Sequence, residues 1–252
     1  MKGLMLLLLL LAAVPARAET IVAGLSQNLV SITADFTGSE ILIYGAVKRD
    51  APAPEGAPLE VVVTVQGPSG PVTVRKKERR FGIWMNTEFA TISRAPVFYA
   101  IASSAPLSEA LSETENLRHE VTIPRAIRAV GIAAKVTDSP RFLDALLRLR
   151  REEGRYSLNE DTVSLVEQTL FRADIELPAN LVDGDYRVRF FITRNGQIVD
   201  TREQIIYVQK AGLERLIFNL AHEQPLLYGL LSLVMAVMAG WGASAAFTLL
   251  RR

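Results

Sequence analysis

The sequence predicts a mostly β ectodomain, one or two immunoglobulin-like β-sandwiches with a helical insertion, followed by one transmembrane helix at the carboxy terminus. Short apolar or alternating runs separated by Gly, Pro, Asn and Asp recur over residues 19–104 and 155–210, as is typical of sandwich strands. Residues 105–154 change to helical spacing. Residues 225–250 carry no charged side chain, and about 20 apolar residues suffice to cross a bilayer.

Residues 1–18 have the three parts of a secretory signal peptide. Lys2 precedes a leucine-rich core, and Ala16-Arg17-Ala18 provides the small-x-small pattern of a cleavage site. The core is too short to span a membrane, which disfavours an uncleaved anchor. We therefore predict export and cleavage after Ala18.

The first β-sandwich-like region, residues 19–104, contains six strand candidates. They are Leu29–Thr33, Ile41–Val47, Leu59–Gln66, Val72–Lys76, Phe81–Asn86 and Val97–Ser103. A turn rich in glycine and proline separates Leu59–Gln66 from Val72–Lys76. We predict that these two strands pair as a hairpin.

The helical insertion, residues 105–154, has its clearest helix at its end. Ser139 can cap a helix that runs from Pro140 to Glu153, and Gly154 suits the position just past its end. Residues 125–137 are compatible with either helix or strand. Before it, Pro106 can begin a first helical segment, with Leu107 and Leu111 at helical spacing, and Pro124 limits that segment.

The second β-sandwich-like region, residues 155–210, contains the strongest local signal. Phe171 to Leu177 alternates apolar and charged residues, which predicts a half-buried strand. A second alternating run begins at Tyr186 and leads into Asn195-Gly196. Both positions of a two-residue hairpin turn need φ > 0, which suits Asn-Gly. A hairpin is therefore predicted, with its second strand beginning at Gln197.

The carboxy-terminal part predicts a membrane anchor. Residues 211–224 place apolar side chains on one helical face, which predicts an amphipathic juxtamembrane helix. Residues 225–250 form the predicted span, and Arg251 and Arg252 form a basic cytoplasmic tail. Together with export, this predicts a single-pass protein of the bacterial inner membrane, with its amino-terminal domain in the periplasm.

Several short motifs, taken in order, resemble one family. They are Leu170-Phe171-Arg172, Leu177-Pro178-Ala179-Asn180, Gly212-Leu213-Glu214-Arg215, Ala221-His222-Glu223-Gln224-Pro225, Tyr228-Gly229 and Gly240-Trp241. Their order resembles an alphaproteobacterial family of predicted single-pass transmembrane proteins of unassigned function. The resemblance covers nearly the whole mature chain. It implies an inner-membrane location with a periplasmic domain and implies no catalytic residue.

The densest charge run has two interpretations. Arg75, Lys76, Lys77, Arg79 and Arg80 surround one acid, Glu78. On a hairpin strand such a run is typical of a solvated edge that discourages aggregation. Alternatively, the five cations form an anion or lipid-headgroup contact. Neighbouring Trp84 would add a stacking surface to such a contact, although burial in the core is the commoner outcome for a tryptophan.

Two further sets of residues are candidate contacts near the membrane. Ser232, Ala236, Gly240 and Ser244 recur every four residues in the span, which favours close approach of a second membrane helix from another copy or another protein. Small residues are also common in spans without such a role. His222 and Glu223 form a candidate juxtamembrane contact, read either as interfacial polar residues or as a pH-sensitive contact.

Composition excludes some functions and favours contact over catalysis. Cleavage would leave 26 of 28 basic residues beside 27 acidic ones, a net charge of −1 that gives no general attraction to nucleic acid. With no Cys, two His and no Gly-x-Ser-x-Gly motif, no catalytic residue, metal site or cofactor is predicted. The carboxylates Glu113 and Glu115 are interpreted as solvated.

We therefore predict a tethered periplasmic binding or accessory module. It acts through contacts with an envelope protein, such as a multi-pass transporter, or with another copy of itself. A periplasmic hydrolase with a site assembled between domains and a structural spacer without a ligand are the alternatives.

Overall fold

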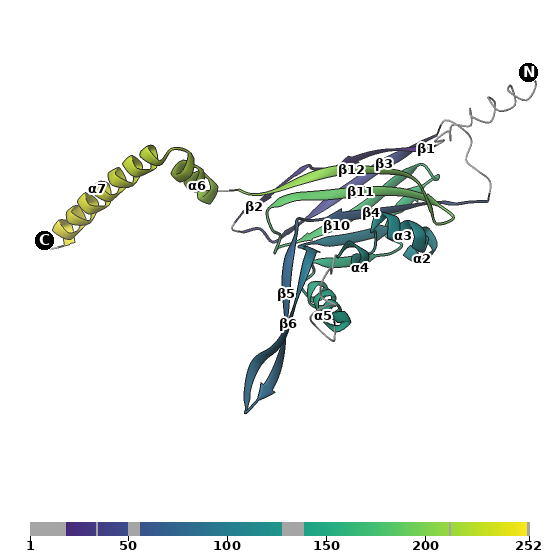
Figure 1. Cartoon of the computed structure of the whole chain (residues 1–252). Helices are drawn as coiled ribbons and strands as arrows, with labels where there is room; N and C mark the ends of the chain where they lie inside the picture. Colours follow the sequence, from purple (N-terminus) through teal and green to yellow (C-terminus); the bar gives the residue numbers. More distant parts are fainter. Residues whose placement is uncertain (1–18, 34, 50–55, 128–138, 212, 251–252) are drawn as a thin grey trace, which may run out of the picture. The chain divides into compact units, whose positions relative to one another are not determined.

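The computed structural model describes residues 19–33, 35–49, 56–127, 139–211 and 213–250 (Figure 1). The predicted signal peptide and the predicted tail at residues 251–252 lie outside this range, as does most of the stretch 125–137. The described chain is mostly β with one long apolar helix at its end, which confirms the predicted class. It divides into a β body, residues 19–30 and 37–208, and a membrane unit, residues 31–36 and 209–250, each with its gaps.

The described strands form three sheets. A four-stranded sheet has the order β1-β3-β10-β9, a six-stranded sheet has the order β2-β12-β11-β4-β7-β8, and β5 pairs with β6 alone. The strands are β1 (Glu19–Leu25), β2 (Leu29–Ile32), β3 (Gly38–Arg49), β4 (Leu59–Gln66), β5 (Ser69–Arg80), β6 (Ile83–Pro96), β7 (Tyr99–Ser103), β8 (Tyr156–Asn159), β9 (Ser164–Val166), β10 (Leu170–Pro178), β11 (Gly184–Arg194) and β12 (Gln197–Lys210).

Both larger sheets combine strands from the two halves of the chain. β3 pairs with β10 in the smaller sheet, and β4 pairs with β11 in the larger one. Phe171 on β10 lies against Phe190 on β11, with ring centroids 6.1 Å apart, so the two sheets share a core. Residues 19–104 and 155–210 therefore contribute to one β core. The immunoglobulin-like type of this sandwich stays a prediction.

The predicted hairpin between Leu59–Gln66 and Val72–Lys76 is wrong. β4 lies between β11 and β7, so both of its edges are occupied, and β5 pairs instead with β6. The physical reason lies in burial. The side chains of β4 are buried on both faces from Val61 to Val65, which suits a central strand, whereas the outer half of β5 is charged and exposed.

The Asn-Gly hairpin is confirmed. Asn195 and Gly196 have φ values of +49° and +74° and join β11 to β12. Between β7 and β8 the chain forms helices α2 (Leu107–Ala110), α3 (Glu113–His119), α4 (Ile123–Ala126) and α5 (Ser139–Glu152). α5 confirms the predicted helix. Its buried Phe142 and Leu146 pack in one cluster with the base of β5 and β6.

The membrane unit contains two helices, α6 (Leu213–Glu223) and α7 (Pro225–Leu250), which confirm the predicted juxtamembrane helix and span as helices. Within the described residues, α7 holds the one helical stretch that is long and apolar enough to cross a membrane. None of that stretch is buried by the rest of the chain. Its uniformly apolar surface is suited to lipid or to another membrane helix.

Candidate functional site

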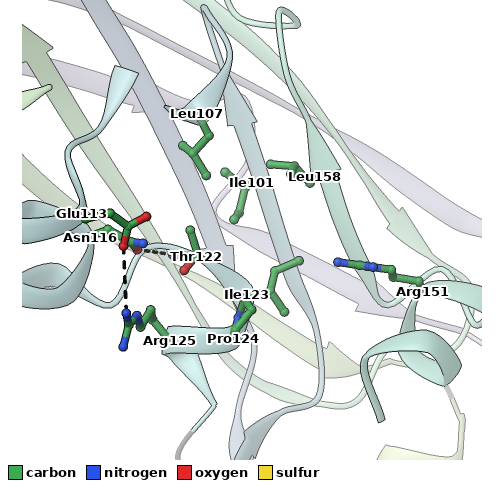
Figure 2. Close-up of a pocket in the computed structure, with 10 residues that line it drawn as sticks. All are labelled: Ile101, Leu107, Glu113, Asn116, Thr122, Ile123, Pro124, Arg125, Arg151 and Leu158. Carbon is green, nitrogen blue, oxygen red and sulfur yellow. Dashed lines mark hydrogen bonds and ion pairs between the residues drawn. The ribbon is translucent and has the colours of Figure 1, made fainter. Parts of the chain in front are cut away.

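A pocket of about 450 Å³ opens on the β body beside the short helices (Figure 2). It is enclosed by side chains of β7, α2, α3, α4, α5 and β8. The lining residues are Ile101, Leu107, Glu113, Asn116, Thr122, Ile123, Pro124, Arg125, Arg151 and Leu158. Because these residues come from six elements, the pocket exists only in the folded body.

Local hydrogen bonds place the helices around the pocket. Ser112 caps α3 by accepting a hydrogen bond from the backbone N–H of Glu115 at 3.4 Å. The backbone N–H of Ser112 donates to the carbonyl of Gly196 at 2.8 Å, which ties this cap to the β11–β12 turn. Asn116 Oδ1 accepts from the N–H of Thr122 at 3.1 Å, and Thr122 is the N-cap residue of α4. The pocket wall is therefore held to the hairpin that the sequence predicts best.

The pocket has an apolar interior and a charged rim. Ile101, Leu107 and Ile123 are buried, and Leu158 on the edge strand β8 is about half-exposed. At the rim, Arg125 Nη2 lies 4.0 Å from Glu113 Oε2 (Figure 2). An apolar interior with few charged groups is typical of a binding site. The ten described lining residues include no His, Cys or Ser.

The second candidate region is the outer ribbon, defined as residues 75–89 of β5, its turn and β6. The base of the ribbon is buried at Val74, Ala90 and Ile92, whereas most of the outer ribbon is exposed. Alternation along β5 places Arg75, Lys77 and Arg79 on one face and Lys76, Glu78 and Arg80 on the other. The sequence predicted the five cations as one group, but the ribbon divides them between two faces.

The two faces of the outer ribbon differ in charge. On one face Lys76 Nζ lies 2.8 Å from Glu78 and 3.8 Å from Glu88, and Arg80 lies 3.4 Å from Glu78. The hydrogen bond and charge of Lys76, followed by those of Arg80, lower the pKa of Glu78. We call this the paired face. Its two cations are balanced by two acids.

The opposite face of the outer ribbon carries cations and aromatic rings. Cross-strand neighbours are Arg75 with Phe89 and Arg79 with Trp84. Phe89 is 65% exposed and Trp84 70% exposed, so the expectation of a core tryptophan is wrong. Lys77 pairs in register with Asn86, which brings no acid to this face. We call it the cationic aromatic face.

The candidate contacts of the membrane unit lie on exposed helix surface. Ser232, Ala236, Gly240 and Ser244 are all exposed on α7, and a Cβ at Gly240 would meet no atom of the chain within 4 Å. On α6, the ring of His222 stacks on Phe218 with centroids 4.0 Å apart, and Glu223 is exposed. Their roles as contacts stay predictions.

A buried cluster around α3 escaped the sequence interpretation. Glu115 is 3% exposed, accepts from Arg118 at 2.6 Å and lies 3.4 Å from His119 Nε2, so its interpretation as solvated is wrong. Arg189 donates to the carbonyl of His119 at 2.6 Å and to the Tyr99 hydroxyl at 3.1 Å. Burial raises the pKa of Tyr99. These bonds fasten α3 to the six-stranded sheet. The four-residue spacing of Glu115 and His119 was the available signal.

Comparisons with known proteins identify a family. A family model described as "Putative transmembrane protein (Alph_Pro_TM)" matches residues 20–248. No curated protein sequence matches the chain. Among solved structures, the crystal structure of the sporulation control protein Spo0M from Bacillus subtilis is similar at 11% identity and a TM-score of 0.29. That match covers 82% of this chain and 55% of that chain, and at this TM-score it carries no conclusion about fold or function.

Proposed function

The chain belongs to the Alph_Pro_TM family of transmembrane proteins, and on that premise we propose that it is a membrane-tethered periplasmic module that binds another envelope protein. A single span, α7, is found within the described residues. The predicted signal peptide and the basic tail after α7 support an orientation with the β body in the periplasm. The membrane in question is then the bacterial inner membrane.

The observation that carries the binding function is the pocket of the β body. Its interior presents apolar surface from Ile101, Leu107 and Ile123 to an opening rimmed by charges. A partner that inserts an apolar side chain would bury this surface, at about 25 cal/mol per Å². The rim charges of Glu113 and Arg125 would orient the partner rather than hold it, because exposed ion pairs contribute little. We therefore assign the pocket to a polypeptide segment with an apolar anchor residue.

α7 supplies the second contact in this proposal. Its small residues at Ser232, Ala236, Gly240 and Ser244 would let a helix of a multi-pass partner approach closely. Binding through both the pocket and the span would raise the effective concentration of each contact for the other. The same stripe on a second copy of the chain would give a homo-oligomer, which the experiment below distinguishes by the identity of the recovered protein.

The test is recovery of partners from gently solubilised membranes, with matched pocket and control variants. Leu158→Glu places a charge in the pocket on the edge strand β8, whereas Val166→Glu places one on the edge strand β9, outside the pocket. Both positions are exposed apolar residues, so both variants are expected to fold. We expect Leu158→Glu to lose a heterologous partner that Val166→Glu retains.

Three results would count against the proposal. Equal recovery with both variants would exclude the pocket as the binding site. Recovery of only the chain itself would indicate a homo-oligomer. Failure to recover any reproducible protein with the unaltered chain would favour a structural spacer.

A further inference from the structure

We propose that the cationic aromatic face of the outer ribbon contacts the anionic phospholipid surface of a membrane. This proposal is independent of the pocket and its protein partner. It concerns Arg75, Lys77 and Arg79 on β5, together with Trp84 and Phe89 on β6. The ribbon would then be a second attachment of the β body to the bilayer, besides the span.

The first step is the distribution of charge over the ribbon. Neither Arg75 nor Lys77 forms an ion pair with any residue that the structure describes, and Arg79 donates to the carbonyl of Gly82 at 3.3 Å. These cations stand two residues apart, roughly 7 Å along an extended strand. Both acids of the outer ribbon, Glu78 and Glu88, belong to the paired face. A row of cations without acids is complementary to a surface of phosphate groups.

The second step is the aromatic surface beside these cations. Trp84 and Phe89 lie on the same face and are 70% and 65% exposed. Tryptophan is enriched at the membrane–water interface, where its apolar ring meets the acyl boundary and its N–H meets the headgroups. Ile83 and Met85 on the paired face are also exposed, but only Trp84 and Phe89 combine an exposed aromatic ring with unbalanced cations on the same face. Cations and aromatic rings together therefore favour a bilayer over bulk water.

The third step is the apex of the ribbon. Phe81 and Gly82 form the two-residue turn between β5 and β6, with φ values of +52° and +83°. A tight hairpin turn of this kind favours Asn, Asp or Gly at both positions. Phe81 holds the left-handed conformation although its side chain is fully exposed and packs on nothing in the described fold. An apolar ring kept at such a position is explained by insertion into something outside the chain.

The paired face shows that the contact has a direction. Its two cations and two acids cancel, so it has little attraction for an anionic surface. The ribbon should therefore approach a bilayer with Arg75, Lys77 and Trp84 toward the lipid. The cationic aromatic face carries three cations and no acid, whereas the charges of the paired face cancel. The preferred orientation therefore depends on where the cations lie and not only on the overall charge of the ribbon.

The experiment uses Trp84 as the probe in the full-length chain. The sequence has two tryptophans, Trp84 and Trp241, so Trp241→Phe leaves Trp84 as the sole tryptophan, which can be excited selectively over the tyrosines at long wavelength. Nanodiscs are made from phosphatidylcholine alone or from equal parts phosphatidylcholine and phosphatidylglycerol, each with a lipid-attached quencher. We expect a blue shift and quenching of Trp84 with phosphatidylglycerol at low salt, and reversal at high salt.

Two charge variants provide the matched comparison. Arg75→Gln with Lys77→Gln removes two cations from the cationic aromatic face, and Lys76→Gln with Arg80→Gln removes two from the paired face. Both pairs lower the net charge equally, and all four residues are exposed. Each cation near an anionic surface contributes about fivefold to the affinity, so the first double substitution should weaken membrane binding roughly 25-fold. The second double substitution should leave the quenching nearly unchanged.

The outcomes that would overturn the proposal are separate from those of the pocket. Equal loss with both charge pairs would show a response to net charge only. Equal quenching in both kinds of nanodisc would exclude anionic lipid as the specific target of the ribbon. If Trp84 stays unquenched in every nanodisc, the ribbon does not contact lipid, and its target would instead be a protein surface. Unchanged thermal unfolding of all variants confirms that each comparison is made on folded protein.

Discussion

Arg194→Met should destabilise the β body more than any exposed charge removal, because Arg194 joins the two larger sheets. Its Nη2 and Nε lie 2.7 Å and 2.9 Å from the two carboxylate oxygens of Glu19 on β1. The exposed fractions are only 8% for Arg194 and 4% for Glu19. Arg49 adds a third bond, from Nε to Glu19 Oε1 at 2.8 Å. The substitution leaves a buried carboxylate with one cationic partner instead of two.

The expected cost follows from that geometry. Removing one member of a buried pair costs about 3–5 kcal/mol. Because Arg49 still bonds Glu19, we expect the low end, about 3 kcal/mol. For a body of this size each kcal/mol shifts Tm by roughly 2–4 °C, which gives a decrease of roughly 6–12 °C. Arg172→Met provides the control, since Arg172 pairs with Asp174 on the exposed surface, where such pairs contribute about 0–1 kcal/mol.

The direction in which pH changes the stability loss of Arg194→Met can also be predicted. Hydrogen bonding from Arg194, and less strongly from Arg49, holds the pKa of Glu19 below its usual value. A carboxyl with a lowered folded pKa stabilises the fold above its unfolded pKa of about 4.3, and this stabilisation is lost as the pH falls through the folded value. In Arg194→Met the buried carboxyl is less depressed and protonates more easily. The deficit of the variant should therefore be largest near neutral pH and shrink below about pH 4.

The assay is thermal unfolding of the full-length chain in detergent micelles, followed by circular dichroism over a pH series. We expect Arg194→Met to unfold well below Arg172→Met near pH 7 and the two to converge in acid. Equal Tm values at neutral pH would refute the claim that the Glu19–Arg194 pair joins the sheets. A deficit that grows in acid would refute the assigned direction of the Glu19 pKa.

Three further substitutions have defined outcomes. Gly45→Ala places a Cβ 2.4 Å from Cζ of Phe171, so we expect a loss of about 1–3 kcal/mol by denaturant titration, whereas Gly70→Ala, with open space around it, should be neutral. At Gly240 an added Cβ meets no atom within 4 Å outside the adjacent backbone of its own helix, so Gly240→Ile should leave unfolding unchanged while weakening helix association in a membrane two-hybrid assay; unaltered association would end the helix-contact hypothesis. His222→Gln should not alter partner recovery between about pH 5 and pH 8, and a shifted pH profile would instead establish a pH-sensitive contact.

The sequence predicted the elements whose signals are local. Asn195-Gly196 specifies its turn by the positive φ values that both residues adopt, and α5 is marked by its apolar face and by Gly154 just past its end. α7 is identified by length and the lack of charge alone. In each case the information lies within one short stretch of chain, so no tertiary contact is needed to read it.

Pairing and burial between distant residues were not predictable in the same way. The turn residues between β4 and β5 correctly predict where one strand ends and the next begins, but they do not determine which strands pair. β4 pairs with β11 and β7, and not with β5. A tryptophan is usually buried in a core, and Trp84 is exposed because β5 and β6 pair only with each other. Leu107 and Leu158 meet at the pocket across a long stretch of sequence that gives no periodic signal.

The orientation of the tethered β body is tested most directly by cysteine labelling in intact spheroplasts. The chain contains no cysteine, so Arg172→Cys at an exposed position of β10 and Arg252→Cys after the span each give a single reactive thiol. A periplasmic body predicts that a membrane-impermeant maleimide labels the cysteine at position 172 in intact spheroplasts. The cysteine at position 252 should react only after permeabilisation. Labelling in the reverse order, or equal protection of both thiols, would contradict a periplasmic body anchored by α7.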